Sequence, residues 1–350
     1  MLKQSVTIRK SQNTTIVGFN ILRLLASIAV LLGHSFTLMG IRYPFSFSIE
    51  KHAVYVFFII SGYFIYQSAL SRSVLSYIIA RIVRIMPGLL GSVLFCVIIG
   101  SIYTNISVGR YIISPLTRQF MLNTFLYVNF YLEGVFVNNP YKGVINGSLW
   151  TLPIEVVSYI LVLVLAVKHG IKTQASILGC AIIVTHEITK FLVETNYDYI
   201  FYATSIKYCL ELNVFFLCGC LIKAIFNNSS VLILEMRYFV ILCLLLCWMN
   251  KLGLYNPILI LIYAIIVINI GHLKIFEKII PLQINNHLLK NDYSYGMYLY
   301  AFPVQQIMIQ YAPKSWIMYV SSTVIITSIL AWASWTYIER EPLKWAKKFI

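Results

Sequence analysis

Long hydrophobic runs separated by short polar connections follow one another along almost the whole chain. About 20 consecutive apolar residues suffice for a helix to cross the hydrocarbon core of a bilayer. Ten runs approach or reach that length, and we expect helices at 17–39, 53–70, 87–105, 149–167, 174–193, 208–226, 238–250, 254–271, 293–311 and 316–337. The pattern therefore predicts an all-α polytopic membrane protein with about ten transmembrane helices.

Composition supports the same class. Hydrophobic residues make up 59% of the chain, charged residues only 11%, and the mean hydropathy is +0.80. A soluble domain usually carries about 25% charged residues. Because no internal repeat, low-complexity stretch or composition boundary divides the sequence, we expect one integral-membrane domain over residues 1–350.

The positions of the positive charges indicate the orientation. The net charge is +15, but Lys and Arg are scattered among the connections, so a nucleic-acid-binding face is not expected. If the N-terminus lies inside, the inner segments hold 18 of the 27 Lys and Arg residues. Positive residues concentrate in cytoplasmic segments, so the pattern predicts that both termini lie inside.

Residues 106–147 form the one long connection, predicted to lie outside. They are rich in aromatic and asparagine residues and too apolar for a flexible linker. A re-entrant segment or lid over a site and an ordinary packed loop both fit this composition.

The seven cysteines form no CxxC pair and no zinc-ligand spacing with the six histidines, so no metal site is expected.

Two ionisable residues, which are energetically costly to place inside a bilayer, interrupt the first run, in "RLLASIAVLLGH". Arg23 and His34 are eleven residues apart, which places them about 16 Å apart along a helix and on the same face. Taken singly, Arg23 could reach the inner headgroups and His34 could make a helix contact. Ionisable residues within spans usually face the interior of a bundle and mark a site or pathway.

Glu155 is a third such residue, in "NGSLWTLPIEVVSY". If the fourth run enters from the outside, Glu155 and His34 lie at matching depths of about 8–9 Å below the outer boundary. A carboxylate beside an imidazole raises its basicity and fixes its tautomer, as a general base requires. We therefore predict a pair of Glu155 with His34.

The segment "RIVRIMP" places Arg81 and Arg84 at positions i and i+3 of a helix, where they share a face. Two guanidinium groups suit phosphate oxygens, although charges that set membrane topology would also fit here. Phosphate-binding charge inside and a base outside suit a phosphorylated donor with a long thin arm. Coenzyme A is such a donor.

Six short segments occur in this order: "FNILRLLASIAVLLGHS", "VYVFFIISGYFI", "RIVRIMP", "GSLWTLPIEV", "YSYGMYLYAFPVQQ" and "YIEREPLKW". Together they resemble the signatures of bacterial membrane-bound acyltransferase family 3, integral-membrane O-acyltransferases that modify surface polysaccharides. The likeness covers nearly the whole chain. It departs at Ala301, where many members carry a histidine, and at "ERE", where a proline is expected one residue earlier.

The resemblance implies ten spans, a donor site facing the cytoplasm, and functional roles for Arg23, His34, Arg81, Arg84 and Glu155. We expect an O-acetyltransferase of the bacterial inner membrane that uses acetyl-CoA as donor and holds no bound cofactor. Its acceptor is expected to be a sugar hydroxyl of a polysaccharide such as O-antigen, capsule or exopolysaccharide, or of a lipid-linked precursor. The sequence is compatible with a homo-oligomer but does not determine the oligomeric state.

The expected roles fall into two groups, donor binding on the inner side and the chemical step on the outer side. Arg23, Arg81 and Arg84 bind the donor, while His34 deprotonates the acceptor hydroxyl or carries the acetyl group, with Glu155 orienting it. Trp150 is a weaker candidate for stacking on a sugar, because interfacial anchoring also explains a tryptophan there. A transporter or flippase with a His34–Glu155 proton pathway is the rival reading, although no inverted repeat supports it.

Overall fold

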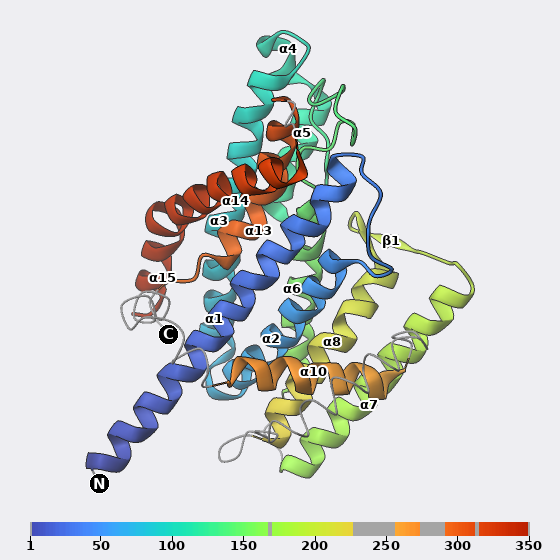
Figure 1. Cartoon of the computed structure of the whole chain (residues 1–350). Coiled ribbons are helices and arrows are strands. Elements are labelled where there is room, and N and C mark those ends of the chain that lie inside the picture. Colours follow the sequence, from blue (N-terminus) through green and yellow to red (C-terminus); the bar gives the residue numbers. More distant parts are fainter. Residues whose placement is uncertain (1, 167–169, 227–255, 274–290, 312–314, 349–350) are drawn as a thin grey trace.

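The computed structural model describes residues 2–166, 170–226, 256–273, 291–311 and 315–348, which form a helical bundle (Figure 1). The helices are α1 (Leu2–Leu38), α2 (Ile49–Ser71), α3 (Val74–Tyr103), α4 (Val108–Ile113), α5 (Pro115–Met121), α6 (Thr151–Leu165), α7 (Ile171–Glu194), α8 (Ile206–Ile225), α10 (Pro257–Gly271), α13 (Ser294–Ile309), α14 (Trp316–Ala333) and α15 (Arg340–Ala346). Shorter elements are the 3₁₀ turns η1 (Leu122–Phe125) and η2 (Gly147–Trp150), the π-helical turn η4 (Ser334–Glu339), and the antiparallel strands β1 (Ile200–Phe201) and β2 (Thr204–Ser205).

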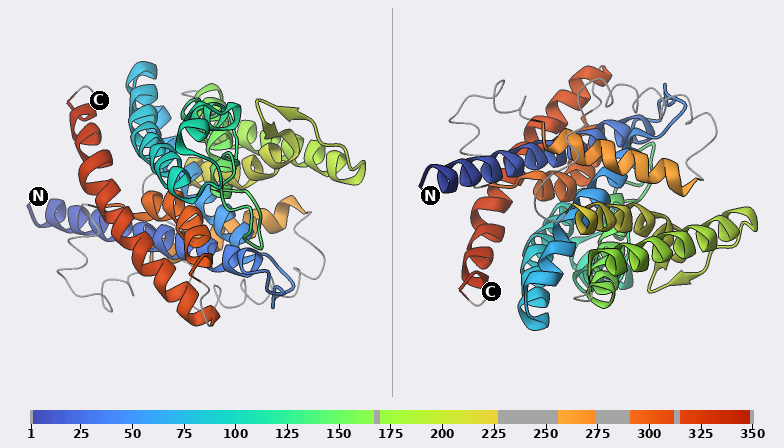
Figure 2. Two further views of the ribbon diagram at one scale, coloured as in Figure 1. Left: turned by 90° about the horizontal axis from the view of Figure 1, so that it is seen from above. Right: turned by 90° about the horizontal axis from the view of Figure 1, so that it is seen from below.

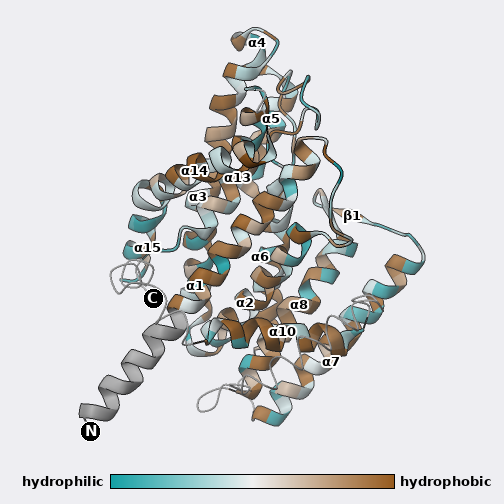
Figure 3. Cartoon of the chain, in the orientation of Figure 1, coloured by the Kyte–Doolittle hydropathy of each residue, from teal (hydrophilic) through white to brown (hydrophobic). Residues whose placement is uncertain are grey.

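The protein is a membrane protein. Within the described ranges, seven helical segments are long and apolar enough to cross a bilayer: Val17–Leu38, Ile49–Ser71, Val74–Tyr103, Gly147–Leu165, Ile171–Glu194, Ile206–Ile225 and Trp316–Ala346. Brown hydrophobic residues follow these helices in Figure 3. Two shorter helices, α10 and α13, cover the predicted eighth and ninth spans, and the predicted seventh span at 238–250 lies outside the described residues.

Two boundaries differ from the sequence-based expectation. The third span was predicted to begin at residue 87, but α3 already begins at Val74 and continues through Pro87. The last span was predicted to end at 337, but helical structure continues through the π-helical turn η4 into α15. In both cases charged residues, which the hydrophobicity pattern treats as an end, lie inside the helix.

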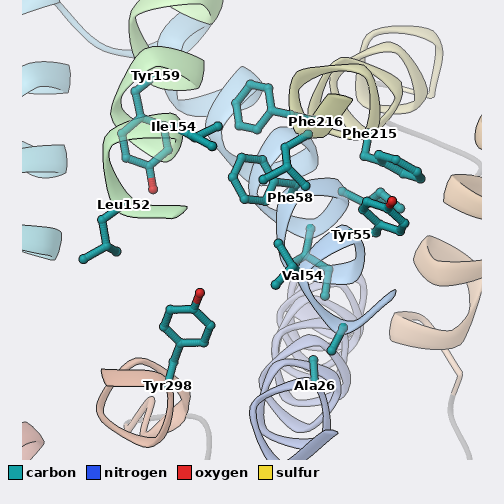
Figure 4. Packing of buried hydrophobic residues seen from close by; sticks show 14 of the residues in the cluster. Ala26, Val54, Tyr55, Phe58, Leu152, Ile154, Tyr159, Phe215, Phe216 and Tyr298 are labelled. Carbon is teal, nitrogen blue, oxygen red and sulfur yellow. The ribbon is translucent and has the colours of Figure 1, made fainter. Parts of the chain in front are cut away.

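The bundle centre is built on a close approach of α2 and α8. A Cβ atom built on Gly219 of α8 would lie 3.0 Å from the backbone nitrogen of Tyr63, and one on Gly62 would lie 3.2 Å from that of Cys220. Small residues at such a crossing let two membrane helices come into backbone contact. Tyr55 of α2 stacks on Phe215 of α8, with ring centroids 3.8 Å apart (Figure 4). By contrast, α7, lime green in Figure 2, stands at the edge of the bundle.

The last part of the long connection between α3 and α6 packs against α13, while α4 and α5 stand at one end of the bundle (Figure 1). Asn146 is fully buried and donates a hydrogen bond to the Leu299 carbonyl of α13 at 2.9 Å. Gln306 of α13 donates to the carbonyl oxygens of Tyr141 and Val144 at 2.9 and 2.7 Å. As a consequence α6 begins deep beside α13, where Thr151 hydrogen-bonds to Tyr298 at 2.7 Å.

Candidate active site

A cavity of about 470 Å³ lies between α1, α2, α3, α6, α13 and α15. Its charged lining consists of five cations and one carboxylate: Arg23, Arg72, Arg81, Arg84, Lys347 and Glu155. The rest is mostly aromatic and aliphatic, with the hydroxyls of Tyr159 and Tyr298 pointing toward one another from opposite walls (Figure 4). Four of the residues singled out from the sequence therefore share one cavity, since Arg23, Arg81, Arg84 and Glu155 all line it.

Asp292, just before α13, joins two of the arginines. Its Oδ2 lies 2.7 Å from Arg84 Nη2 and 3.8 Å from Arg23 Nη1, while its Oδ1 accepts from the backbone and hydroxyl of Ser294 at 3.1 and 2.5 Å. Burial disfavours its charge, but Arg84, Arg23 and the Ser294 hydrogen bonds prevail and hold the pKa of the Asp292 carboxyl below its usual value. One ionised carboxylate thus ties α1, α3 and α13 together.

Arg84 has a second acidic neighbour in Glu339 of η4, at 3.7 Å. The Glu339 side chain is only 2% exposed and accepts a hydrogen bond from Ser334 at 2.8 Å. The π-helical turn brings this carboxylate to the cavity wall behind Arg84. Arg23 and Arg84 are therefore substantially neutralised by protein carboxylates.

Arg81 differs from both. Its guanidinium lies over the rings of Tyr77 and Tyr159, 5.7 and 5.6 Å from their centroids. Its Nε is buried without a hydrogen-bond partner, and the described residues place no carboxylate within salt-bridge distance of it. A cation held between two rings and left without a counterion is ready to bind an anion.

Glu155 belongs to the arginine end of the site. It accepts a hydrogen bond from Tyr159 one turn along α6 and interacts electrostatically with Arg23. It was predicted beside His34 from equal depths, but α6 begins at the level of Tyr298, to which Thr151 hydrogen-bonds. Glu155, one turn after Thr151 on α6, lines the cavity with the arginines and does not form the predicted pair with His34.

The carboxylate beside His34 is Glu50, at the start of α2. Glu50 packs against the helix backbone at Gly33, where an added Cβ would lie 2.8 Å from the Glu50 Cβ, and it interacts electrostatically with His34. Tyr43 donates a hydrogen bond to Glu50 Oε2 at 2.7 Å. Burial, together with this hydrogen bond, raises the pKa of Tyr43 to about 12, so the phenol stays a donor at neutral pH.

His34 is held against α13. Its ring meets the edge of Phe302 with centroids 5.3 Å apart, and its Nδ1 is buried without a hydrogen-bond partner. Contacts on either side fix this turn of α1, because Gln305 donates to the Leu31 carbonyl at 2.8 Å and Trp316 to the Ser35 hydroxyl at 2.7 Å. The backbone that carries His34 is therefore held in place, and the Nδ1 atom of the ring remains available as a proton acceptor.

The arginine cavity ends before it reaches His34. Along α13, Tyr295 and Tyr298 line the cavity, whereas Phe302, one turn beyond Tyr298, contacts the histidine. Phe57 meets Tyr298 edge to face at 5.8 Å and lines the same end. Tyr298, held by Thr151, thus separates the two parts of the candidate site.

Trp150 lies away from both parts, with its ring against Tyr208 of α8 at 5.6 Å.

The sequence did not predict three acidic residues of the site, Glu50, Asp292 and Glu339. Glu50 resembles an ordinary acidic residue in the first turn of a helix, and Asp292 an N-terminal cap. No spacing pattern shows that these residues face His34 or the arginines, because their partners lie on other helices.

Comparison with known sequences decides the family. The pattern of the acyltransferase domain, family 3, matches residues 16–336. The chain belongs to this acyltransferase family. An O-acetyl transferase from Shigella phage Sf6 is similar to the acyltransferase described here, with 29% identity over 331 residues, 92% of this chain and 94% of the phage protein. No solved structure matches.

Membership in this family identifies the chain as an acyltransferase rather than the transporter or flippase that was considered from the sequence. The match extends from the first membrane span into η4, so it includes Arg23, His34, Arg81, Arg84, Glu155 and Asp292. The acyltransferase thus carries these six residues within the family domain, whereas the buried Glu339 lies just beyond the matched residues.

Proposed function

We propose that the protein is an O-acetyltransferase that moves an acetyl group from acetyl-CoA to a sugar hydroxyl of a cell-surface polysaccharide, such as O-antigen, or of its lipid-linked precursor. The observation that carries the donor assignment is the cationic cavity, in which Arg81 has no acidic partner among the residues that the structure describes. An anionic head would bind there, while a thin neutral arm would extend along the aromatic wall toward Tyr298.

The donor site would face the cytoplasm, where acetyl-CoA is made, and the acceptor would approach the His34 end from the other side of a bacterial inner membrane. Aromatic rings surround that end: Phe36 stacks on Trp316 at 5.2 Å, and Phe45 and Phe47 of the neighbouring connection are exposed. Such rings offer apolar faces to a sugar. The two-to-one charge bias supports this orientation.

In the transfer step, His34 would take the proton of the acceptor hydroxyl. The hydroxyl oxygen attacks the thioester carbon, the carbon–sulfur bond breaks, and the leaving thiolate recovers a proton from the imidazolium. The negative charge of Glu50 stabilises that imidazolium, as an acidic orienting residue does in other histidine bases. Glu155 keeps Tyr159 and the arginines in place. Tyr298 must swing aside for the thioester to reach His34.

The test is acetyl transfer by membranes that contain the full chain, with radiolabelled acetyl-CoA and mass spectrometry of the surface glycan from the same cells. His34→Gln should abolish acetylation without changing the amount of protein in the membrane. His52→Gln is a matched control, because His52 lies on α2 among Phe47, Tyr55 and Tyr263, away from the cavity. Wild-type acetylation by the His34→Gln variant would refute the proposal.

A further inference from the structure

The two ends of the cavity differ in exposure. At one end, the lining residues Val54 and Leu152 are buried. At the other end, Arg72, at the C-terminus of α2, and Lys347, at the C-terminus of α15, are both exposed. We call this pair the cationic mouth. The cavity therefore opens to the surface of the protein at these two cations.

The cationic mouth is not neutralised by the protein. Within the described ranges, neither Arg72 nor Lys347 has a carboxylate within salt-bridge distance, in contrast to Arg84 with Asp292 and Glu339. Partial burial, and after it the charge of Arg81 in the same cavity, lower the pKa of Arg72. These positive charges repel one another unless an anion binds among them.

The depth of the cavity limits what this anion can be. From Val54 to Ser71, α2 runs about 26 Å at 1.5 Å per residue, and the cavity follows it from the buried end to Arg72. A ligand that fills this path needs an anionic group at one extremity and a narrow, largely uncharged portion that reaches the other. A small free anion would occupy only the mouth and leave the apolar part of the cavity empty.

Acyl-CoA carries phosphate at two places. Its pyrophosphate lies between the nucleoside and the pantetheine arm, and its ribose 3′-phosphate lies beyond, farther from the thioester. If the thioester lies toward Tyr298 and the pyrophosphate meets Arg81, the outermost phosphate falls at the cationic mouth. Arginine and lysine there provide charge-assisted hydrogen bonds to phosphate oxygens.

We propose that Arg72 and Lys347 bind the ribose 3′-phosphate of the donor, so that the enzyme selects acyl-CoA over the dephospho form. This inference rests on the proposed function, since it takes acyl-CoA as the donor. It assigns the two arginines that protein carboxylates neutralise, Arg23 and Arg84, to holding the helices, and the two uncompensated cations of the mouth to recognising the nucleotide.

A phosphate at this position could also belong to a lipid headgroup, and the experiment separates the two sources. The full-length protein is placed in nanodiscs of phosphatidylcholine, and the dissociation constants of CoA and dephospho-CoA are measured by calorimetry. The wild-type protein should bind CoA about tenfold more tightly than dephospho-CoA, as expected for the loss of charged hydrogen bonds. No acceptor is needed for this measurement.

Arg72→Gln and Lys347→Gln should weaken the binding of CoA while leaving that of dephospho-CoA unchanged, and the double variant should bind both equally. Lys344→Gln is the matched control, because Lys344 lies on α15 but pairs with Glu341 at 2.7 Å and does not line the cavity. These surface substitutions remove no buried contact, so the protein should remain folded.

Equal weakening of both ligands, or of neither, would overturn the inference. If phosphatidylglycerol in the nanodiscs abolishes the preference for CoA in the wild-type protein, the mouth serves lipid headgroups and the inference also fails. The proposed function is judged separately by acetyl transfer. Binding that prefers CoA without any transfer would refute the function, and transfer without the preference would refute only the role of the mouth.

Discussion

Asp292 and Arg84 form the shortest ion pair of the cavity wall, 2.7 Å between Oδ2 and Nη2, and the same oxygen faces Arg23. Because Asp292 stands at the start of α13, this pair holds the helix that also carries Tyr298 and Phe302. This ion pair therefore helps to hold in place the helix whose Phe302 contacts His34.

Replacing Asp292 by Asn should destabilise the protein, because two arginines near the cavity would lose their common counterion. We expect a loss of about 2 kcal/mol, read as a lower thermal midpoint in detergent. Since the folded-state pKa of Asp292 is depressed, its contribution is fully present above the unfolded pKa of 3.8 and is lost as the pH falls through the folded pKa. The difference between wild type and Asp292→Asn should therefore persist at neutral pH and shrink below pH 3.8. A difference that does not depend on pH would contradict this.

The two carboxylates, Glu50 and Glu155, should affect different kinetic constants. Glu50→Gln should lower kcat about tenfold or more while leaving the KM for acetyl-CoA unchanged, because the charge beside His34 acts on proton transfer. Glu155→Gln should mainly raise that KM, because the arginines repel one another without it. Glu194→Gln, at the exposed end of α7, serves as the control. The opposite assignment of the two effects would show that Glu155 supports the base.

Arg81→Lys tests whether the flat guanidinium matters as well as its charge. Lysine would keep the positive charge but lose the stacking between Tyr77 and Tyr159 and the bidentate geometry. We expect the dissociation constant of CoA to rise about fivefold, equivalent to roughly 1 kcal/mol of cation–π and hydrogen-bond energy. Tyr159→Phe retains the ring and should bind CoA more tightly than Arg81→Lys. Unchanged affinity of Arg81→Lys would mean that charge alone suffices.

The crossing of α2 and α8 should tolerate no added side chain. Gly219→Val places atoms within 3.0 Å of the backbone of α2, so the helices must separate, at a cost of about 1–3 kcal/mol. Gly179→Val provides a comparison, because a Cβ there meets nothing within 4 Å. Thermal unfolding in detergent should show a lower midpoint for Gly219→Val alone. Equal midpoints for both variants would refute the close crossing.

Much of the helix pattern could be predicted from hydrophobicity, because each span is determined by its own residues. The predicted runs at 149–167 and 208–226 correspond to Gly147–Leu165 and Ile206–Ile225. The shared face of Arg81 and Arg84 also follows from helix geometry alone. Boundaries at charged residues were less predictable, as the early start of α3 shows, because a helix that faces a polar cavity continues through arginines.

Contacts between residues on different helices could not be predicted from the sequence. The depth of Glu155 was calculated from the end of a hydrophobic run, but the actual level of α6 depends on how residues 104–150 fold against α13. That packing rests on hydrogen bonds such as the one from Asn146 to Leu299, between residues 153 positions apart. Similarly, Glu50 meets His34 only because the connection after α1 turns back over Gly33.

The lining of the arginine cavity runs from Phe19 to Lys347, almost the whole of a 350-residue chain. During synthesis, the first span therefore enters the bilayer long before Asp292, the ion-pair partner of Arg23, has been made. Asp292 and Lys347 arrive only with the last segments. A chain that stops before residue 292 thus lacks the carboxylate that joins Arg23 to Arg84 and part of the cavity wall.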